Sequence, residues 1–193
     1  MTTPRILVFG GSLRRDSWNQ KLASVAATGA KAAGAEVTLI SLNDFPMPLF
    51  NEDLEDESGL PEGAKQLKQL MFEHHGLIIA SPEYNSSITA ALKNAIDWVS
   101  RTTSDDEPPM AAFTGKVAAL CSASPGALGG MRGLVHLRAI LGNIGVLVLP
   151  DQVALSKAHE AFREDGTLAD PKMEARVKKL TAQLTQHLMK QLA

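Results

Sequence analysis

Short, continuously apolar segments alternate with amphipathic segments along the chain. The apolar segments are rich in β-branched residues and show no polar alternation, which is typical of parallel strands covered on both faces. We expect five strands, at residues 6–9, 37–40, 77–80, 117–121 and 146–149. Helical spacing predicts helices at residues 19–33, 62–74, 90–101, 131–141 and 171–192. The irregular stretches 44–60, 102–114 and 151–170 are expected to be surface loops.

This order of strands and helices predicts an α/β fold with a parallel sheet and helices on both faces. Five strands fit the flavodoxin-like order 2-1-3-4-5, in which a ligand binds where strands 1 and 3 diverge. A six-stranded dinucleotide-binding fold is the competing topology, but the sequence offers no sixth apolar strand. We expect residues 1–193 to form a single domain of the flavodoxin type.

Composition narrows the class of protein. The 193 residues include 19 basic and 21 acidic side chains and one cysteine. The near-neutral charge, without a basic cluster, gives no support for nucleic-acid binding. The single cysteine excludes a disulfide framework and favours the cytoplasm. The first apolar segment is too short for a signal peptide or a membrane span, so no membrane insertion is expected.

The loop after the first predicted strand has features of a phosphate site. Two glycines allow close backbone approach, and a Ser17/Gln20 pair predicts a capping box at the start of the following helix. The loop lacks both G-x-x-x-x-G-K-[ST] and G-x-G-x-x-G, so a terminal monophosphate suits it better than a nucleoside triphosphate or a dinucleotide. The plain alternative is a capped helix with two solvated arginines. The expected anion-binding residues are Ser12, Arg14, Ser17 and Asn19.

A second loop follows the third predicted strand. If strands 1 and 3 are neighbours, this loop faces the same crevice as the phosphate loop. Pro82 fixes the direction of the chain, Tyr84 offers an aromatic wall, and Asn85 can donate or accept hydrogen bonds. Taken alone, Tyr84 and Glu83 would be ordinary surface residues.

The chain resembles the NADPH-dependent FMN reductase family, which includes bacterial quinone, chromate and azo-dye reductases. The matching segments are Gly11-Ser12-Leu13-Arg14 with Ser17 and Asn19, Pro82-Glu83-Tyr84-Asn85, residues 92–98 with Ser100 and Arg101, and Gly129-Gly130 with Arg132, Leu137 and Arg138. The chain departs from the family pattern at Thr89-Ala90-Ala91, where relatives often carry proline and glycine.

The resemblance implies FMN as cofactor, with NADPH or NADH as electron donor. It implies that Ser12, Arg14, Ser17, Trp18 and Asn19 surround the phosphate, that Pro82, Glu83, Tyr84 and Asn85 border the isoalloxazine ring, and that Ser122 and Ser124 form a third ligand loop. We therefore hypothesise an NAD(P)H oxidoreductase that reduces quinones or similar small acceptors by a ping-pong mechanism. Because FMN carries the chemistry, no catalytic side chain is expected.

Other interpretations remain open from the sequence. A non-catalytic electron carrier for a protein partner is the main alternative, although balanced charge gives little electrostatic steering. A cofactor-free protein that kept the fold is another. Five scattered histidines predict no metal site, and Cys121 is expected in the core. Few aromatic residues and an amphipathic helix through Trp98 suggest a homodimer or homotetramer, in which a subunit contact is one role for Trp98 and internal packing the other.

Overall fold

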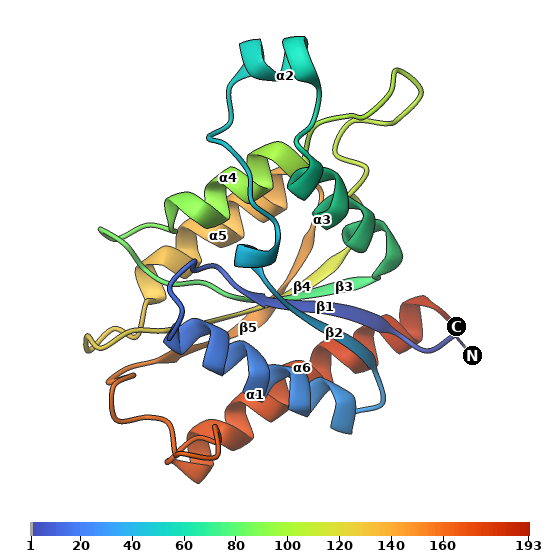
Figure 1. The fold of residues 1–193 in the computed structure, drawn as a ribbon. Coiled ribbons are helices and arrows are strands. Elements are labelled where there is room, and N and C mark those ends of the chain that lie inside the picture. Colours follow the sequence, from blue (N-terminus) through green and yellow to red (C-terminus); the bar gives the residue numbers. More distant parts are fainter. Residues whose placement is uncertain (1) are drawn as a thin grey trace.

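The computed structural model describes residues 2–193 and shows a five-stranded parallel sheet within them (Figure 1). The strand order is β2-β1-β3-β4-β5, which confirms the flavodoxin-like topology predicted from the sequence. The strands are β1 (Arg5–Gly10), β2 (Glu36–Ser41), β3 (Gly76–Ala80), β4 (Val117–Ala123) and β5 (Leu147–Leu155). Each expected strand is present, in several cases one or two residues longer than its apolar segment.

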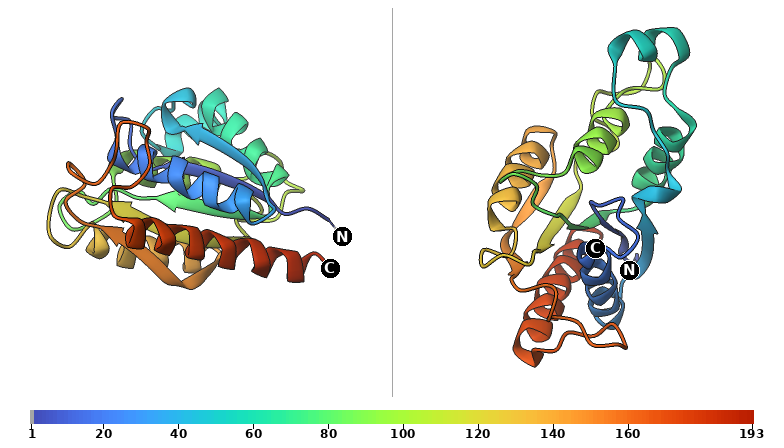
Figure 2. Two further views of the ribbon diagram at one scale, coloured as in Figure 1. Left: turned by 90° about the horizontal axis from the view of Figure 1, so that it is seen from below. Right: turned by 60° about the vertical axis from the view of Figure 1, so that its left-hand side comes forward.

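Helices cover both faces of the sheet (Figures 1 and 2). One face is covered by α1 (Trp18–Ala32) and α6 (Pro171–Gln191), which pack against each other. The other face is covered by α3 (Glu62–Glu73), α4 (Ala90–Val99) and α5 (Met131–Asn143). Two apolar cores result, one on each side of the sheet.

The register of the central strands decides where their loops begin. Gly10 at the end of β1 pairs with Ala80 at the end of β3, and Ala80 pairs with Cys121 of β4. Every residue of β3 and β4 is buried, as the continuous apolar segments predict. The loops that follow β1, β3 and β4 therefore start at the same edge of the sheet.

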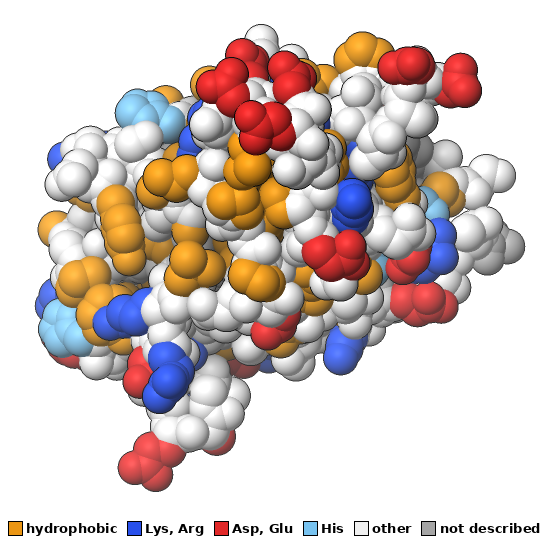
Figure 3. Space-filling model, turned by 45° about the horizontal axis from the view of Figure 1, so that its top comes forward, with side chains coloured by type: hydrophobic (Ala, Val, Ile, Leu, Met, Phe, Trp, Pro, Cys, Tyr) orange, Lys and Arg blue, Asp and Glu red, His pale blue; other side chains and the backbone are white. Residues whose placement is uncertain are grey.

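Two expected surface loops contain regular structure, so those predictions were wrong in part. The stretch 44–60 contains α2 (Glu52–Ser58), in which five of seven residues are acidic and none is buried. Figure 3 shows acidic side chains gathered over this projecting helix. Asn51 caps its first turn, and the acidic residues there complement the helix dipole. A helix without an apolar face leaves no periodic signal in the sequence.

The second error concerns β5, which continues to Leu155 although the sequence suggested a loop from residue 151. The register of β5 against β4 shifts between Ala118 and Leu120, which is a bulge around Pro150. Proline is compatible with a bulge in an edge strand. Arg138 donates to the carbonyl oxygen of Leu149 at 2.8 Å, so the bulge does not leave this acceptor unpaired.

Trp98 packs inside the chain. Its side chain is fully buried, its ring meets Phe50 edge-on at 5.0 Å between centroids, and its Nε1 donates to the carbonyl oxygen of Pro48 at 2.8 Å. Of the two roles expected from the sequence, internal packing is the one observed. The side chain of Trp98 is therefore not available for a subunit contact, because the segment before α2 already covers it. A contact through the rest of α4 stays a prediction.

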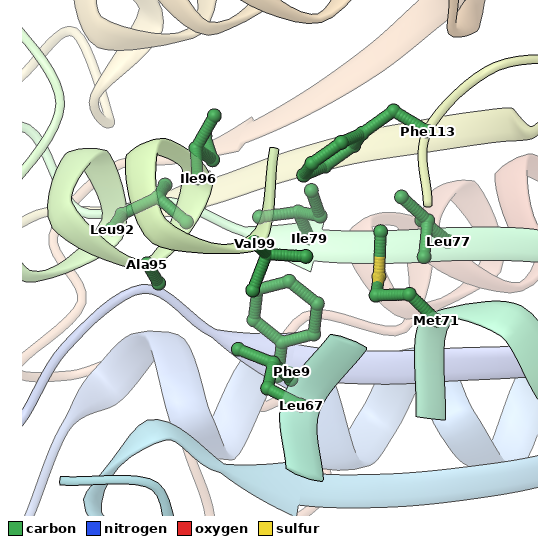
Figure 4. A pocket seen from close by; sticks show the side chains of 10 residues that line it. All are labelled: Phe9, Leu67, Met71, Leu77, Ile79, Leu92, Ala95, Ile96, Val99 and Phe113. Atoms are coloured by element: carbon green, nitrogen blue, oxygen red, sulfur yellow. The ribbon is translucent and has the colours of Figure 1, made fainter. Parts of the chain in front are cut away.

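A small cavity lies in the core between the sheet and α3 and α4 (Figure 4). Its volume is about 20 Å³, and only apolar side chains line it. A buried water needs two or more polar partners, and this cavity offers none. It is therefore a packing gap and not a ligand site.

Among residues 2–193, no helix has both the length and the apolar character needed to cross a bilayer.

Candidate FMN site at the carboxyl edge of the sheet

The loops after β1, β3 and β4 enclose a common cavity of about 320 Å³. Figures 1 and 2 show these loops together at one end of the sheet. Nine of the eleven residues predicted from the sequence line this cavity, and Asn85 and Ser122 do not. The lining residues are Ser12, Arg14, Ser17, Trp18, Asn19, Pro82, Glu83, Tyr84, Ala123, Ser124 and Pro125.

The first loop presents hydrogen-bond donors at the start of α1. Ser17 is the N-cap, and its Oγ accepts from the backbone N–H of Gln20 at 3.3 Å. The first intrahelical hydrogen bond runs from the backbone N–H of Lys21 to the carbonyl oxygen of Ser17. The N–H groups of Trp18 and Asn19 precede these bonds and are available to an anion.

The predicted capping box is present only in half. Ser17 caps the helix, but the side chain of Gln20 does not return to it. Instead, Gln20 Oε1 accepts from the backbone N–H of Gly10 at 3.0 Å, and its Nε2 donates to the carbonyl oxygen of Ile40 at 2.8 Å. These groups lie at the ends of β1 and β2, where the backbone leaves the sheet and needs partners.

Arg14 brings a positive charge to the mouth of the cavity. Its guanidinium carbon lies 4.6 Å from the centre of the Trp18 ring, and Nη2 donates to the carbonyl oxygen of Asp16 at 2.7 Å. Ser12 Oγ accepts from the backbone N–H of Arg14 at 3.1 Å, which leaves the hydroxyl proton of Ser12 available for donation. Trp18 thus serves as a platform that orients Arg14.

The second loop is a tight hairpin beside the cavity. The backbones of Tyr84 and Ser87 exchange hydrogen bonds at 2.9 and 3.0 Å. Between them, Asn85 and Ser86 have φ values of 51° and 68°, the left-handed conformation that a two-residue hairpin turn of type I′ requires. Tyr84 lines the cavity and is 55% exposed at its rim. Asn85 lies at the tip of the turn, which accounts for its absence from the cavity wall.

Glu83 links the second loop to the start of α5. Its carboxylate accepts from the backbone N–H groups of Arg132 and Gly133 at 3.0 and 3.2 Å and forms an ion pair with the Arg132 side chain. Burial alone would raise the pKa of Glu83, but the bonds from Arg132 and Gly133 together hold this pKa below its usual value. Glu83 is therefore an anion in a fixed position and is not a free surface acid.

The third loop is built by two polar residues with different roles. Ser122 is fully buried, and its Oγ donates to the carbonyl oxygen of Gly129 at 2.6 Å, so it shapes the loop without reaching the cavity. Ser124 lines the cavity and accepts from the backbone N–H of Gly126 at 3.3 Å. Ala123 and Pro125 are lining residues that the sequence analysis missed, and their only signal was their position beside Ser124.

The lone cysteine takes no part in this site. Cys121 is fully buried in β4, and desolvation raises the pKa of its thiol to about 12. The reactive form of cysteine is the thiolate, which is not available at such a pKa. The expectation that Cys121 belongs to the core is confirmed.

Comparison with known proteins agrees with this geometry. A family model described as NADPH-dependent FMN reductase matches residues 4–160. The chain belongs to this family. It is 37% identical over 169 residues to an NAD(P)H-dependent FMN reductase from Pseudomonas aeruginosa, covering 87% of this chain and 86% of that one. It is 34% identical over 145 residues to a quinone reductase from Escherichia coli, covering 75% and 73% of the two chains.

The fold also matches that of a solved flavoenzyme. FerB, a flavoenzyme NAD(P)H:(acceptor) oxidoreductase from Paracoccus denitrificans, superimposes with a TM-score of 0.81 at 27% identity, covering 97% of this chain and 98% of FerB. Family membership confirms the expected class of oxidoreductase, with FMN as cofactor and NAD(P)H as electron donor.

Proposed function

We propose that this chain, as one domain, passes electrons from NADPH or NADH to quinones or similar small acceptors in ping-pong order. One observation carries the proposal: three loops from neighbouring strands enclose one cavity, with anion-binding donors on its first-loop wall. Relatives named quinone reductase and 2-hydroxy-1,4-benzoquinone reductase support the class of acceptor.

The first-loop donors fit the phosphate of FMN. The helix dipole contributes only about 0.3–1 kcal/mol, whereas each hydrogen bond to a charged group contributes about 1.5–3 kcal/mol. We therefore assign phosphate binding mainly to Ser12, Arg14, Ser17 and the backbone N–H groups of Trp18 and Asn19. We assign the ring to the wall formed by Pro82, Tyr84 and Ser124. The cavity volume of about 320 Å³ lies at the lower end of the range for small-molecule sites, about 300–1,000 Å³.

When bound, FMN supplies the hydride and electron chemistry. The residues of the chain then have to bind, orient and leave one face of the ring open. Glu83 is held as an anion by Arg132 and Gly133, so it would not donate a proton to the ring. Nicotinamide and acceptor would use the open side of the cavity in turn, which is the reason for proposing a ping-pong order.

Anaerobic stopped-flow mixing tests the reductase activity. The FMN-loaded protein is mixed with NADPH or NADH, and we expect direct bleaching of the flavin absorbance, followed by recovery on adding a quinone. Parallel double-reciprocal plots would support the ping-pong order, whereas intersecting plots would contradict it. Flavin that is bleached only when a partner protein is present would identify an electron carrier instead. Failure to bind FMN at micromolar concentration would refute the proposal.

We also infer a homodimer or homotetramer. Leu128, Met131 and Val135 are 46%, 45% and 59% exposed and follow one side of α5 and its preceding turn, with Tyr84 as another exposed apolar residue. We expect sedimentation velocity to show an oligomer and Val135→Glu to shift it toward monomer. A monomer at working concentrations in the unmodified protein would contradict this inference.

A cytoplasmic location is part of the same proposal. Its support is the single cysteine, which is unpaired and buried.

A further inference from the structure

Thr89 connects the first two loops of the cavity. It is the N-cap of α4, and its Oγ1 accepts from the backbone N–H of Leu92 at 3.1 Å. The same hydroxyl donates to the carbonyl oxygen of Gly11, which lies 78 residues earlier in the chain. Thr89 is only 3% exposed. Its hydroxyl therefore acts both as acceptor within its own helix and as donor to the first loop.

Gly11 is held from several directions. Its backbone N–H donates to the carbonyl oxygen of Ala80 at 2.9 Å, and its carbonyl accepts from Thr89. A Cβ at position 11 would lie 2.9 Å from Leu92 Cδ2 and 3.3 Å from Pro82 Cδ, so the backbone packs directly on the second loop and α4. Both peptide groups of Gly11 are thereby fixed relative to β3 and α4.

The bond from Thr89 also determines the direction of a neighbouring donor. The Gly11 carbonyl and the Ser12 N–H belong to the same planar trans peptide, so they point in opposite directions. With the carbonyl held toward Thr89, the Ser12 N–H is held away from α4. Ser12 itself lines the cavity.

We propose that Thr89 is a positioning residue for phosphate recognition: its hydroxyl fixes the Gly11–Ser12 peptide so that the Ser12 N–H is presented to the phosphate of FMN. This inference rests on the proposed function. It assigns to Thr89 an effect on the phosphate and none on the ring, and that difference makes it testable. Riboflavin has the same ring as FMN and lacks the phosphate.

The test compares FMN and riboflavin binding by fluorescence titration of the cofactor-free protein. Thr89→Val keeps the shape of the side chain and removes the hydroxyl. We expect it to weaken FMN binding about fivefold, the size of one hydrogen bond, and to leave riboflavin binding unchanged. Thr89→Ser keeps the hydroxyl and should restore the FMN affinity. The inhibition constant of inorganic phosphate against FMN binding should be higher in Thr89→Val than in the unmodified protein.

A control separates this effect from the loss of a helix cap. Asp170 caps α6 by accepting from the backbone N–H of Lys172 at 2.8 Å, and it is not among the residues that line the cavity. Asp170→Ala should lower stability to a similar degree without changing the ratio of FMN to riboflavin affinity. If Thr89→Val does not fold, Thr89→Ala carries the same expectation.

The outcomes are distinct. Equal weakening of FMN and riboflavin in Thr89→Val, or no weakening of either, would overturn the role of Thr89 and leave the proposed function intact. Absence of FMN binding in the unmodified protein would instead overturn the proposed function.

Discussion

Asn19 joins the first loop to the third, and its replacement should show how much that connection stabilises the fold. Its Nδ2 donates to the carbonyl oxygen of Ala123 and its Oδ1 accepts from the N–H of Ala123, both at 2.8 Å. The two residues are 104 positions apart in the sequence, and Asn19 is 4% exposed. Asn19→Ala removes both bonds while leaving a good helix-forming residue in the first turn of α1.

The expected cost follows from these two bonds. Each contributes about 0.5–1.5 kcal/mol net, and a buried group left without a partner costs about 1–3 kcal/mol. Asn19 and Ala123 both line the cavity, so water can replace part of what is lost. We therefore expect Asn19→Ala to lower the free energy of unfolding by about 2–3 kcal/mol.

Urea denaturation of the FMN-free protein measures this change. The urea concentration at the unfolding midpoint should fall, while the slope of the free energy of unfolding against urea concentration stays the same. Asn143→Ala is the matched control, because Asn143 is exposed at the end of α5. A loss below about 0.5 kcal/mol, or one equal to that of the control, would refute the reasoning, since surface substitutions lie in that range.

Three further predictions follow from charged groups. Arg14→Ala should weaken FMN binding roughly tenfold or more, as expected for the loss of one hydrogen bond to a charged group. Arg15→Ala removes a cation outside the cavity and should change FMN binding little. Equal effects of the two substitutions in fluorescence titration would contradict the role of Arg14. The pKa of Glu83 is lower in the folded state than its ordinary value of 4.5, so its contribution is complete above that value and is lost as pH falls through the folded pKa. Unfolding midpoints measured from neutral to acidic pH should therefore fall less steeply in Glu83→Gln, and identical slopes would contradict this. Burial lowers the pKa of Lys116 from 10.5 to about 8, so the stability of the unmodified protein relative to Lys116→Met should rise between about pH 8 and 10.5, and a flat difference would contradict this.

Much of the fold could be predicted because its signals are local. The segment at residues 77–80 is apolar at every position, so as a strand it buries all its side chains only when both faces are covered. The structure shows this, because β3 is buried at every position. The same holds for the cap at Ser17, which depends on backbone groups within one helical turn. Once the strands are placed, parallel registry brings Gly10 and Ala80 to one level, and the position of the site follows.

The remaining features depend on distant partners. The sequence around Gln20 predicts a capping box, but in the folded chain its side chain forms hydrogen bonds with the backbone of Gly10 and Ile40 near the ends of β1 and β2. Ser122 resembles a ligand-binding residue, yet the nearest acceptor in the folded chain is the carbonyl oxygen of Gly129. Asn85 is polar and adjacent to the cavity, but its backbone is needed in the left-handed conformation at the tip of a hairpin. For Gln20 and Ser122 the outcome was set by which backbone group lay within reach after folding, and for Asn85 by the conformation of the turn.

These distant partners hold the loops of the cavity wall in fixed positions. Asn19 joins the first loop to the third, Thr89 joins the second to the first, and Glu83 joins the second to α5. Each of these connections runs from a side chain to a backbone group, and each fixes the direction of a peptide plane near the cavity wall. Ordering flexible loops on binding costs free energy, and loops ordered in advance avoid that cost. We therefore expect the affinity for FMN to depend on these connections as well as on the charge of Arg14, and a variant that keeps every charge but breaks one connection should still bind FMN more weakly.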